Sequence, residues 1–407
     1  MRHDLAYNKV VNWLISAVRW LSTSLPKRII AEGTATKARQ YLGVSVFRLI
    51  FEKLTKKHCE LTPDFHGKST VIFDGVTGTL PDTESNVEEF GKPSNKKGSS
   101  AFPKIRVVAL MSLALRCILD VAYAPYKGKG TGERALMRQI LEKFKDKSFL
   151  FLLDAGFYSF EFLGLFKDTQ QEFIIRFEGK TKIKKVKKLP DSSYIGQIKK
   201  KFKNPNSTPQ KHLPQIEREV TVRVIPYQVK GYLATKLITN IFDETITAIE
   251  IVKHYHKRWD IELTFDEIKN RQCATLKGQL GTIFRSKTAE LVEQELYAII
   301  MTYNGIRQLM CQACEIHNKN PRFISFLDVL QFVKDAIPII SIRLRPIQEA
   351  FNYLLYLIAE SDIDRPRRPR VNPRVVKVSH SKFKRKSAIH KEEIRSFEND
   401  IQIIQIV

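Results

Sequence analysis

Two hydrophobic periodicities run along the chain, and the places where one gives way to the other outline the fold. Apolar residues recur at helical spacing in residues 10–21 and 44–54, which predicts a helical region near the N-terminal end. From Ser69 onward, short apolar runs alternate with segments of helical spacing, a pattern typical of an α/β sheet. The predicted strands lie at residues 69–74, 104–125 (two strands), 148–154 and 172–177, and the predicted helices at residues 132–145 and 159–167. For residues 104–125 the pattern alone does not exclude a helix.

The second half of the chain departs from this rhythm. Residues 179–245 carry a basic run, a Pro/Asn/Ser loop and alternating apolar positions, which predicts a mostly β insertion. Long helices are predicted after it at residues 247–272 and 286–306. Four parts are predicted. They are a helical N-terminal region with a possible DNA-binding role (1–66), a core (67–178 and 246–312), the β insertion (179–245) and a helical C-terminal region with a basic tail (313–407).

The charge of the chain narrows the range of partners. Lys and Arg number 68 against 43 Asp and Glu, a formal net charge of +25. Ten of the basic residues fall within residues 365–386, which contain no acidic residue and predict a solvated tail. This charge attracts a polyanion, so nucleic acid is the expected partner, although an anionic membrane surface or a ribosome satisfies the same charge.

Cysteine usage and hydropathy predict the compartment. The five cysteines have no disulfide-framework spacing, which indicates free thiols in a reducing environment. Cys311, Cys314 and His317 are residue types that bind metal, but no second ligand pair lies nearby, and we interpret them as ordinary helix residues. The longest apolar run, residues 107–115, is too short for a bilayer. The sequence predicts a soluble, cytoplasmic protein that does not enter a membrane.

Two acidic residues give the first indication of chemistry. Asp74 and Asp154 each end an apolar run, and each has a glycine within the next two residues. A carboxylate at the end of a buried strand is held in position by the strand, while a turn beside it lets the side chain reach a metal ion. Acids at such places also commonly cap turns, so each one alone is a weak signal.

A third acidic residue comes with a stronger pattern. Four polar residues fall within a wedge of about 60° if their segment forms one α-helix, at about 100° per residue. These residues are Tyr255, Arg258, Glu262 and Lys269. A structural ion-pair stripe on a surface helix is the alternative interpretation. Asp266 lies on the same stripe, so the spacing does not decide between Glu262 and Asp266 as the functional carboxylate.

These residues resemble the motifs of a known family. The spacing Tyr-x2-Arg-x3-Glu-x6-Lys is the signature of bacterial DDE transposases of the insertion-sequence-four family. DGVTGTLPDTESN around Asp74 and LLDAGFYS around Asp154 are similar to the family's first two acidic motifs. The resemblance extends from about Ala38 to the tail, and it assigns Glu262, rather than Asp266, to the glutamate position.

The resemblance implies a fold and an activity. The implied fold is α/β, a ribonuclease-H-like mixed sheet with flanking helices and a β insertion. The implied activity is cleavage and joining of transposon ends with two Mg²⁺ or Mn²⁺ ions per active site. The implied partners are double-stranded DNA, as terminal inverted repeats and target, and a second copy of the chain in a synaptic homodimer. The implied location is the nucleoid in the cytoplasm of a bacterium or archaeon. The implied metal ligands are Asp74, Asp154 and Glu262, and the implied phosphate-binding residues are Tyr255, Arg258 and Lys269.

Two other functions are the alternatives. A DNA-binding protein or repressor derived from a transposase would keep the basic surface without catalysis, and the short N-terminal region favours it. A basic RNA-binding or ribosome-associated protein would explain the charge but not three acidic motifs in order. Relatives that form hairpin ends hold a flipped base with a tryptophan of the insertion. This insertion has none, and Phe202, Tyr227 and Tyr232 are the aromatic residues that would replace it.

Overall fold

The structure is a computed structural model in which contacts divide the chain into two compact units. Unit 1 consists of Met1–Asp146 and Trp259–Asp364, and unit 2 consists of Lys147–Arg258 and Arg365–Val407. This division differs from the predicted one, since residues 147–178 group with the strands of the predicted insertion. The described residues are 31, 33–56, 63–95, 98–166, 171–178, 181–200, 219–273, 284–341, 345–361, 370–371 and 395–404.

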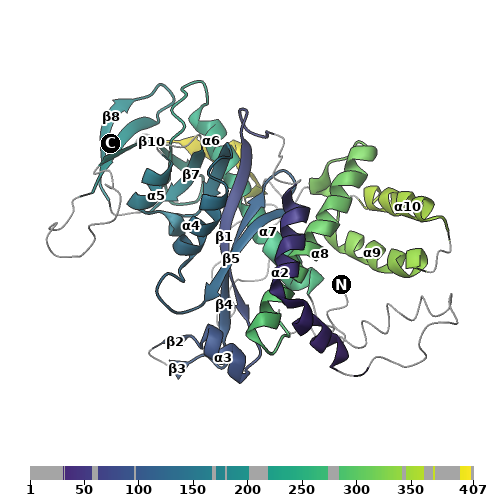
Figure 1. Cartoon of the computed structure of the whole chain (residues 1–407). Helices are drawn as coiled ribbons and strands as arrows, with labels where there is room; N and C mark the ends of the chain where they lie inside the picture. The colour runs from purple at the N-terminus through teal and green to yellow at the C-terminus, as the bar shows by residue number, and fades with distance from the viewer. Residues whose placement is uncertain are drawn as a thin grey trace. The chain divides into compact units, whose positions relative to one another are not determined.

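The sheet of unit 1 is built from three antiparallel strands in the order β5-β4-β1 (Figure 1). The strands are β1 (Ser69–Thr79), β4 (Lys104–Ser112) and β5 (Ile118–Pro125). All three were expected from their apolar runs, but β1 is longer than predicted. It continues past Asp74, which pairs with Ala109, to Thr79, which pairs with Lys104. The prediction that Asp74 ends its strand is therefore wrong, because the ladder with β4 carries the chain through it.

Gly75 and Gly78, which the sequence suggested would form a tight loop, instead lie within β1. Both lie inside the strand, where glycine is otherwise unfavourable. A Cβ on Gly75 would lie 2.6 Å from the carboxyl carbon of Glu133, and one on Gly78 would lie 2.5 Å from the ring of Phe284. Both glycines therefore allow a side chain to lie directly against the strand.

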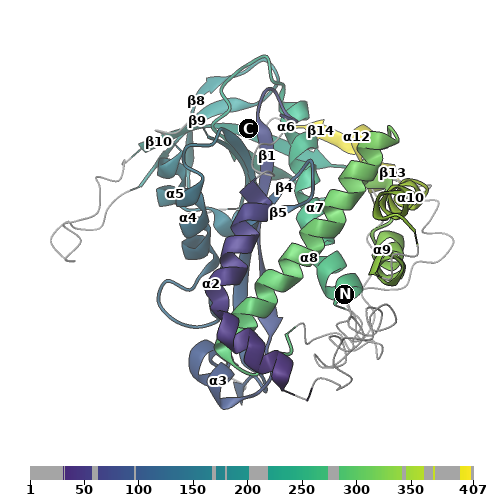
Figure 2. The same cartoon turned by 45° about the vertical axis from the view of Figure 1, so that its right-hand side comes forward.

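Helices cover this sheet and form their own core. α4 (Glu133–Lys143) packs on β4 and β5, and α2 (Thr34–Lys56) lies alongside α8 (Ala289–Ile316), as Figure 2 shows. The apolar core joins residues of β4, β5 and α8 with α9 (Phe326–Ser341) and α10 (Ile347–Ala359). The remaining short elements of unit 1 are α3 (Glu84–Phe90), β2 (Ser94–Asn95), β3 (Gly98–Ser99) and η5 (Pro321–Phe323).

Unit 2 has a mixed sheet in the order β6-β7-β11-β10-β9-β8. β6 and β7 are parallel, joined through α5, and the strands of the predicted insertion extend the sheet through an antiparallel β7–β11 pair. The prediction of a mostly β segment is confirmed for its described residues. The elements are β6 (Phe149–Leu153), η2 (Ala155–Phe157), α5 (Phe160–Leu165), β7 (Glu172–Phe177), β8 (Ile183–Lys188), β9 (Tyr194–Lys199), β10 (Glu219–Val229) and β11 (Thr235–Thr239).

The predicted single helix at residues 247–272 consists of four segments of different helical type. They are α6 (Ala248–Tyr255), the 3₁₀ turn η3 (His256–Trp259), α7 (Asp260–Asp266) and the π-helical η4 (Glu267–Gln272). A constant 100° per residue therefore does not apply, and the single wedge of four side chains is wrong as geometry. The boundary between the two units falls inside η3, after Arg258.

The C-terminal region returns to unit 2 after the basic tail. β12 (Arg370–Val371) pairs with β13 (Arg395–Ser396), and the short helix α12 (Phe397–Asp400) leads into β14 (Ile401–Ile403), which pairs with β10. Most of the predicted tail at residues 365–386 lies outside the described residues. Within the described part of the chain, no helix is long and apolar enough to cross a membrane. The predicted α/β class is confirmed.

Candidate active site

Unit 1 brings two of the predicted acids onto neighbouring elements. Asp74 lies half-buried in β1, where the backbone N–H of Gly75 donates a hydrogen bond of 2.8 Å to its Oδ1. Glu262 is a half-buried residue of α7, and α7 packs against β1. Lys269, on the following π-helical segment, faces the same strand. Three of the six predicted site residues are thus gathered around one stretch of β1.

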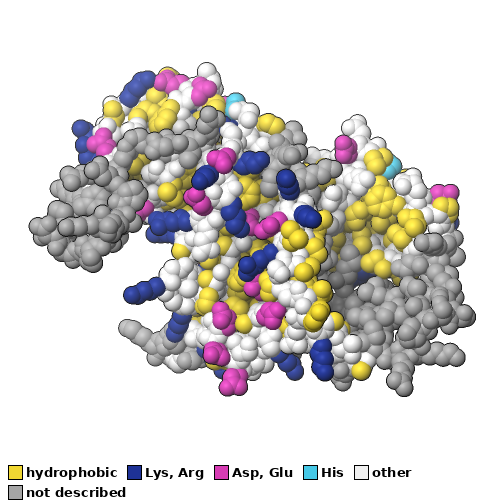
Figure 3. Space-filling model, in the orientation of Figure 1, with side chains coloured by type: hydrophobic (Ala, Val, Ile, Leu, Met, Phe, Trp, Pro, Cys, Tyr) yellow, Lys and Arg dark blue, Asp and Glu magenta, His cyan; other side chains and the backbone are white. Residues whose placement is uncertain are grey.

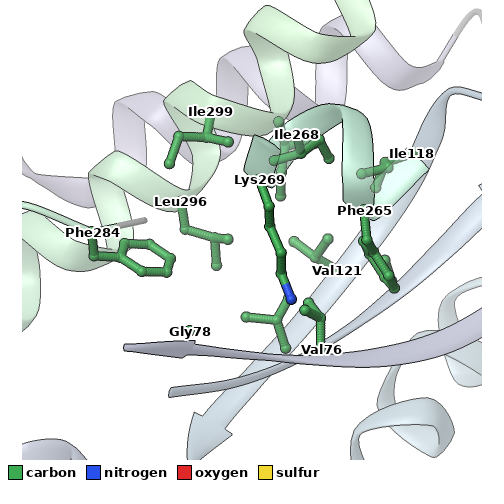
Figure 4. A pocket seen from close by; sticks show the side chains of 13 residues that line it. Val76, Gly78, Ile118, Val121, Phe265, Ile268, Lys269, Phe284, Leu296 and Ile299 are labelled. Atoms are coloured by element: carbon green, nitrogen blue, oxygen red, sulfur yellow. The ribbon is translucent and has the colours of Figure 1, made fainter. Parts of the chain in front are cut away.

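Lys269 reaches this strand through an apolar pocket of about 50 Å³. Its side chain descends from η4 toward β1, and its amine nitrogen lies beside Val76 (Figure 4). Burial among apolar side chains lowers the pKa of Lys269, and the negative charge of Asp74 acts in the opposite direction. The ammonium group is therefore within electrostatic reach of the first predicted acid. The other lining residues are Gly78, Val107, Ala109, Ile118, Val121, Phe265, Ile268, Phe284, Leu296, Ile299 and Ile300.

Behind α7 and η4 lies a buried group of charges that the sequence analysis missed. The carboxylate of Glu267, in η4, accepts hydrogen bonds from Arg307 and from the Tyr303 hydroxyl, the latter at 3.1 Å. Arg116, in the β4–β5 connection, lies 3.3 Å from the same carboxylate. All four residues are at most 9% exposed, and burial raises the pKa of Tyr303 to about 12. The segment that carries Lys269 is thereby held to α8 and to the β4–β5 connection by buried charged contacts.

Asp154 is positioned in unit 2 by the end of β6. The parallel register pairs Leu153 with Ile175 of β7, which brings the next residues, Asp154 and Arg176, side by side. Arg176 Nη2 lies 3.1 Å from Asp154 Oδ1, but not in the geometry of a hydrogen bond. Within the described residues this buried carboxylate oxygen accepts no hydrogen bond. Arg176 is a second residue that the sequence analysis missed, although an arginine in an otherwise apolar strand was a visible signal.

Tyr255 and Arg258 lie in the same part of unit 2. Tyr255 is 5% exposed, and its hydroxyl donates a hydrogen bond of 3.1 Å to the carbonyl oxygen of Leu153, immediately before Asp154. Burial raises the pKa of Tyr255, Arg258 lowers it and Asp154 raises it further. Arg258 is itself 6% exposed. These contacts place Asp154, Tyr255 and Arg258 within electrostatic reach of one another.

Two of the weaker expectations can now be assessed. Tyr227 is 3% exposed, so in this structure its ring is not available to stack on a base, while Phe202 lies outside the described residues. The described cysteines are free thiols. Among the described residues, no three His, Cys, Asp or Glu side chains are grouped as they would be to hold a metal ion.

Comparison with known proteins gives a family match and several similar proteins. Residues 65–304 match the family described as the transposase DDE domain. The chain is 29% identical over 320 residues to transposase InsG for insertion sequence element IS4 of Escherichia coli K12, covering 76% of this chain and 68% of that protein. It is 30% identical over 139 residues to the putative transposase InsZ of the same organism, covering 33% and 45%. A cryo-EM structure of a piggyBac transposase synaptic complex with hairpin DNA has a TM-score of 0.43 at 10% identity, covering 88% and 72%.

The matched segment includes Asp74, Asp154 and Glu262 and more than half of the chain. The chain belongs to the transposases with a DDE domain. Its likeness to the IS4 transposase confirms the resemblance to the insertion-sequence-four family that the motifs indicated.

Proposed function

We propose that this chain cleaves DNA at the ends of an insertion sequence and joins those ends to target DNA, acting as a homodimer. One observation carries the proposal: in each unit, a predicted metal-binding acid lies within electrostatic reach of a predicted phosphate-binding cation. Asp74 is matched with Lys269, and Asp154 with Arg258. Negative groups for metal beside positive groups for phosphate are what phosphodiester chemistry requires of a protein.

The residues that would hold the metal ions are Asp74, Asp154 and Glu262. All three are half-buried carboxylates, which are the donors that Mg²⁺ and Mn²⁺ prefer. The buried Oδ1 of Asp154, which accepts no hydrogen bond in the described part of the chain, suits a metal ligand. Bound ions would activate the attacking oxygen and stabilise the leaving oxygen at phosphorus.

The remaining site residues have positioning and binding roles in this proposal. Arg258 and Lys269 hold the phosphate next to the bond that breaks, since a fixed cation there stabilises the charge of the transition state. Tyr255 keeps the end of β6, and with it Asp154, in place through its hydrogen bond to Leu153. A contact between Tyr255 and phosphate stays a prediction.

The test uses DNA from the regions that flank the coding sequence. End-labelled fragments are incubated with the purified chain and Mg²⁺, Mn²⁺, Ca²⁺ or a chelator. We expect cleavage at one defined position with Mg²⁺ or Mn²⁺, and a complex of two chains with two DNA ends. Tight binding of the ends without cleavage in any metal would support the alternative of a DNA-binding protein or repressor. Absence of preferential binding to the ends would contradict both.

We expect Arg258→Ala and Lys269→Ala to slow cleavage and joining more than they weaken DNA binding. Losing one charge-assisted contact to the reacting phosphate costs about 1.5–3 kcal/mol, roughly ten- to a hundredfold in rate. The measurement is the single-turnover cleavage rate at saturating protein, beside the dissociation constant from gel shifts.

Neighbouring cations are the matched controls for these two variants. Lys257 is exposed beside Arg258, and Arg271 is exposed two residues after Lys269. Lys257→Ala and Arg271→Ala should leave the cleavage rate within about twofold of the wild type. If Arg258→Ala loses only affinity, to the same extent as Lys257→Ala, then Arg258 is part of a binding surface and not of the reacting site.

The edge strand β8 predicts a second, separable contribution to DNA binding. It presents four exposed lysines, and a bulge at Val186 turns two of them to each face of the sheet. Figure 3 shows dark blue side chains in the region where Figure 1 labels β8. These lysines are Lys184, Lys185, Lys187 and Lys188.

Replacing these four lysines by glutamine should flatten the salt dependence of DNA binding. Each lysine that contacts a phosphate contributes about 0.9 to the slope of log affinity against log salt. The cleavage rate at saturating protein should stay unchanged. Replacing the same residues by arginine keeps the charge and should preserve the slope. An unchanged slope in the glutamine variant would exclude β8 from the DNA interface.

A further inference from the structure

The segment after the basic tail completes the sheet of unit 2. β14 pairs antiparallel with the end of β10, with Tyr227 opposite Ile403 and Val229 opposite Ile401. The backbone N–H of Lys230 donates to the carbonyl of Asp400 at 3.0 Å. Tyr227 also pairs with β11 on its other side, so β14 occupies the flank of β10 that β9 leaves at Val224. The chain therefore fills a strand position that would otherwise be an open edge.

This segment also packs on the turn that carries Arg258. The ring of Phe397 lies with its centroid 3.9 Å from that of His256, the first residue of η3. His256 in turn makes an edge contact of 5.8 Å with the ring of Tyr227. β14 packs against α6, and Ile401 is 8% exposed. One aromatic group thus joins the C-terminal segment, β10 and the beginning of η3.

The aromatic group lies next to the charged residues of the site. Tyr227 is 3% exposed and burial raises its pKa to about 12, while the positive charges of Arg176 and Arg258 act to lower it. Both cations are therefore within electrostatic reach of the Tyr227 hydroxyl. The contacts lead from Phe397 through His256 and Tyr227 to the two arginines around Asp154.

Helix α6 leads into η3, and its own residues cap its N-terminal end but not its C-terminal end. α6 begins with a capping box, in which Thr247 and Glu250 satisfy each other's backbone groups. Its other end passes directly into the 3₁₀ turn, a conformation with poorer hydrogen-bond geometry than an α-helix. The direction of Arg258 therefore depends on what packs against that turn, and the C-terminal segment does so.

We propose that residues 397–403 form a strap that aims Arg258 at the DNA, with Phe397 as the principal positioning residue. The strap acts through His256 and Tyr227 and does not itself touch DNA or metal. Because the readout is cleavage, the proposal rests in part on the proposed function.

The main test is a chain that ends at residue 394, which keeps the basic stretch 365–386 and loses the strap. We expect its DNA affinity to stay within about twofold of the wild type and its cleavage rate to fall about three- to tenfold, the range that a lost aromatic contact accounts for. A synthetic peptide of residues 395–407 should restore the rate in a saturable manner, since a free strand can add to the vacated edge of β10.

Point variants keep the test valid if the shortened chain does not fold. Phe397→Ala should reproduce the loss of cleavage rate, and Phe397→Tyr, which retains a ring, should restore it. Gln402→Ala is the matched control, because Gln402 belongs to the same strap but its side chain is exposed on β14. A wild-type cleavage rate in Phe397→Ala would overturn the strap as a positioning element.

A second readout does not depend on cleavage. Hydrogen exchange of the backbone amides at residues 256–259 should be about three- to tenfold faster in Phe397→Ala than in Gln402→Ala. Unchanged protection in Phe397→Ala overturns the proposal. If the wild-type chain does not cleave DNA at all, the proposed function fails, and the exchange experiment still decides whether the strap supports the turn.

Discussion

Asp74→Asn, Asp154→Asn and Glu262→Gln are each expected to lower DNA strand cleavage about a thousandfold or more. Each substitution removes one of the charged metal ligands that we propose and keeps the size of the side chain. Metal ions account for several kcal/mol of transition-state stabilisation in such reactions. DNA binding should persist, because a basic chain that loses one negative charge repels phosphate less. The measurement is single-turnover cleavage of an end-labelled fragment in Mg²⁺, with gel-shift affinity determined in parallel.

Asp266 offers a matched control for Glu262. Both lie on α7, but the Asp266 side chain is 41% exposed, accepts a hydrogen bond of 2.6 Å from Asn270 and lies 3.9 Å from Arg271. Asp266→Asn should therefore cleave at the wild-type rate. If Asp266→Asn abolishes cleavage and Glu262→Gln does not, the assignment of the glutamate position is reversed. Wild-type cleavage by any of the three acid variants removes that acid from the metal site.

Asp154→Asn has an additional expected effect, because Arg176 lies against this carboxylate. The amide no longer holds the guanidinium electrostatically, so the positive charge of Arg176 becomes more available to a phosphate. DNA affinity at low salt should therefore rise in Asp154→Asn relative to Asp74→Asn. In Asp74→Asn the nearby cation is Lys269, which is already desolvated in its apolar pocket. Losing the Asp74 charge therefore changes the availability of Lys269 to phosphate less than losing the Asp154 charge changes that of Arg176.

The strands could be predicted from this sequence where a continuous apolar run coincides with a buried strand. β4 to β7 appear where those runs lie, since a buried strand needs a continuous apolar sequence and little else. In β1, by contrast, the apolar run ends before the strand does. Its second half contains Asp74, Gly75 and Gly78, which have the composition of a turn, yet pairing with β4 keeps it extended. The reason for the glycines lies in Glu133 and Phe284, which are distant in sequence.

Residues 247–272, which carry the family signature, show a second limit of prediction from hydrophobic periodicity. The spacing of Tyr255, Arg258, Glu262 and Lys269 indicated the family, but not the local geometry of residues 247–272. No proline or glycine interrupts residues 247–272, so nothing local indicates a 3₁₀ turn at His256 or a π-helical segment at Glu267. These departures are accompanied by tertiary contacts, with Phe397 on the first and Arg307 on the second. Side-chain contacts over such separations are not visible in hydrophobic periodicity.

The burial of the charged residues around Glu267 could not be predicted from the sequence. A glutamate and an arginine in helices usually mark solvent-facing positions, yet Glu267 is 5% and Arg307 2% exposed. Their burial requires that the carboxylate of Glu267 be shared among Arg307, Arg116 and Tyr303. Such groups are a weak source of stability compared with apolar packing, but removing one member is costly.

Glu267→Ala is accordingly expected to destabilise the chain by about 3–5 kcal/mol, because it leaves two buried guanidinium groups without their carboxylate. The urea midpoint of the wild type and the variant, followed by circular dichroism, measures the change. Glu142→Ala is the surface control. Its ion pair with Lys145 is exposed on both sides, and its loss should cost about 1 kcal/mol or less.

Replacing all three charged residues together distinguishes two contributions to the free energy of unfolding. One is the cost of leaving a buried charge unpaired, and the other is the net contribution of the whole charged group. In the variant Glu267→Met, Arg307→Met, Arg116→Met no buried charge of this group is left unpaired, so most of the stability lost in Glu267→Ala should return. Cleavage should not return with it if the charged contacts hold η4, and with it Lys269, against the strand that carries Asp74. A triple variant that is both stable and fully active would show that apolar packing alone suffices to position this segment. Equal destabilisation by Glu267→Ala and Glu142→Ala would show that the Glu267 carboxylate is not a buried charge in solution.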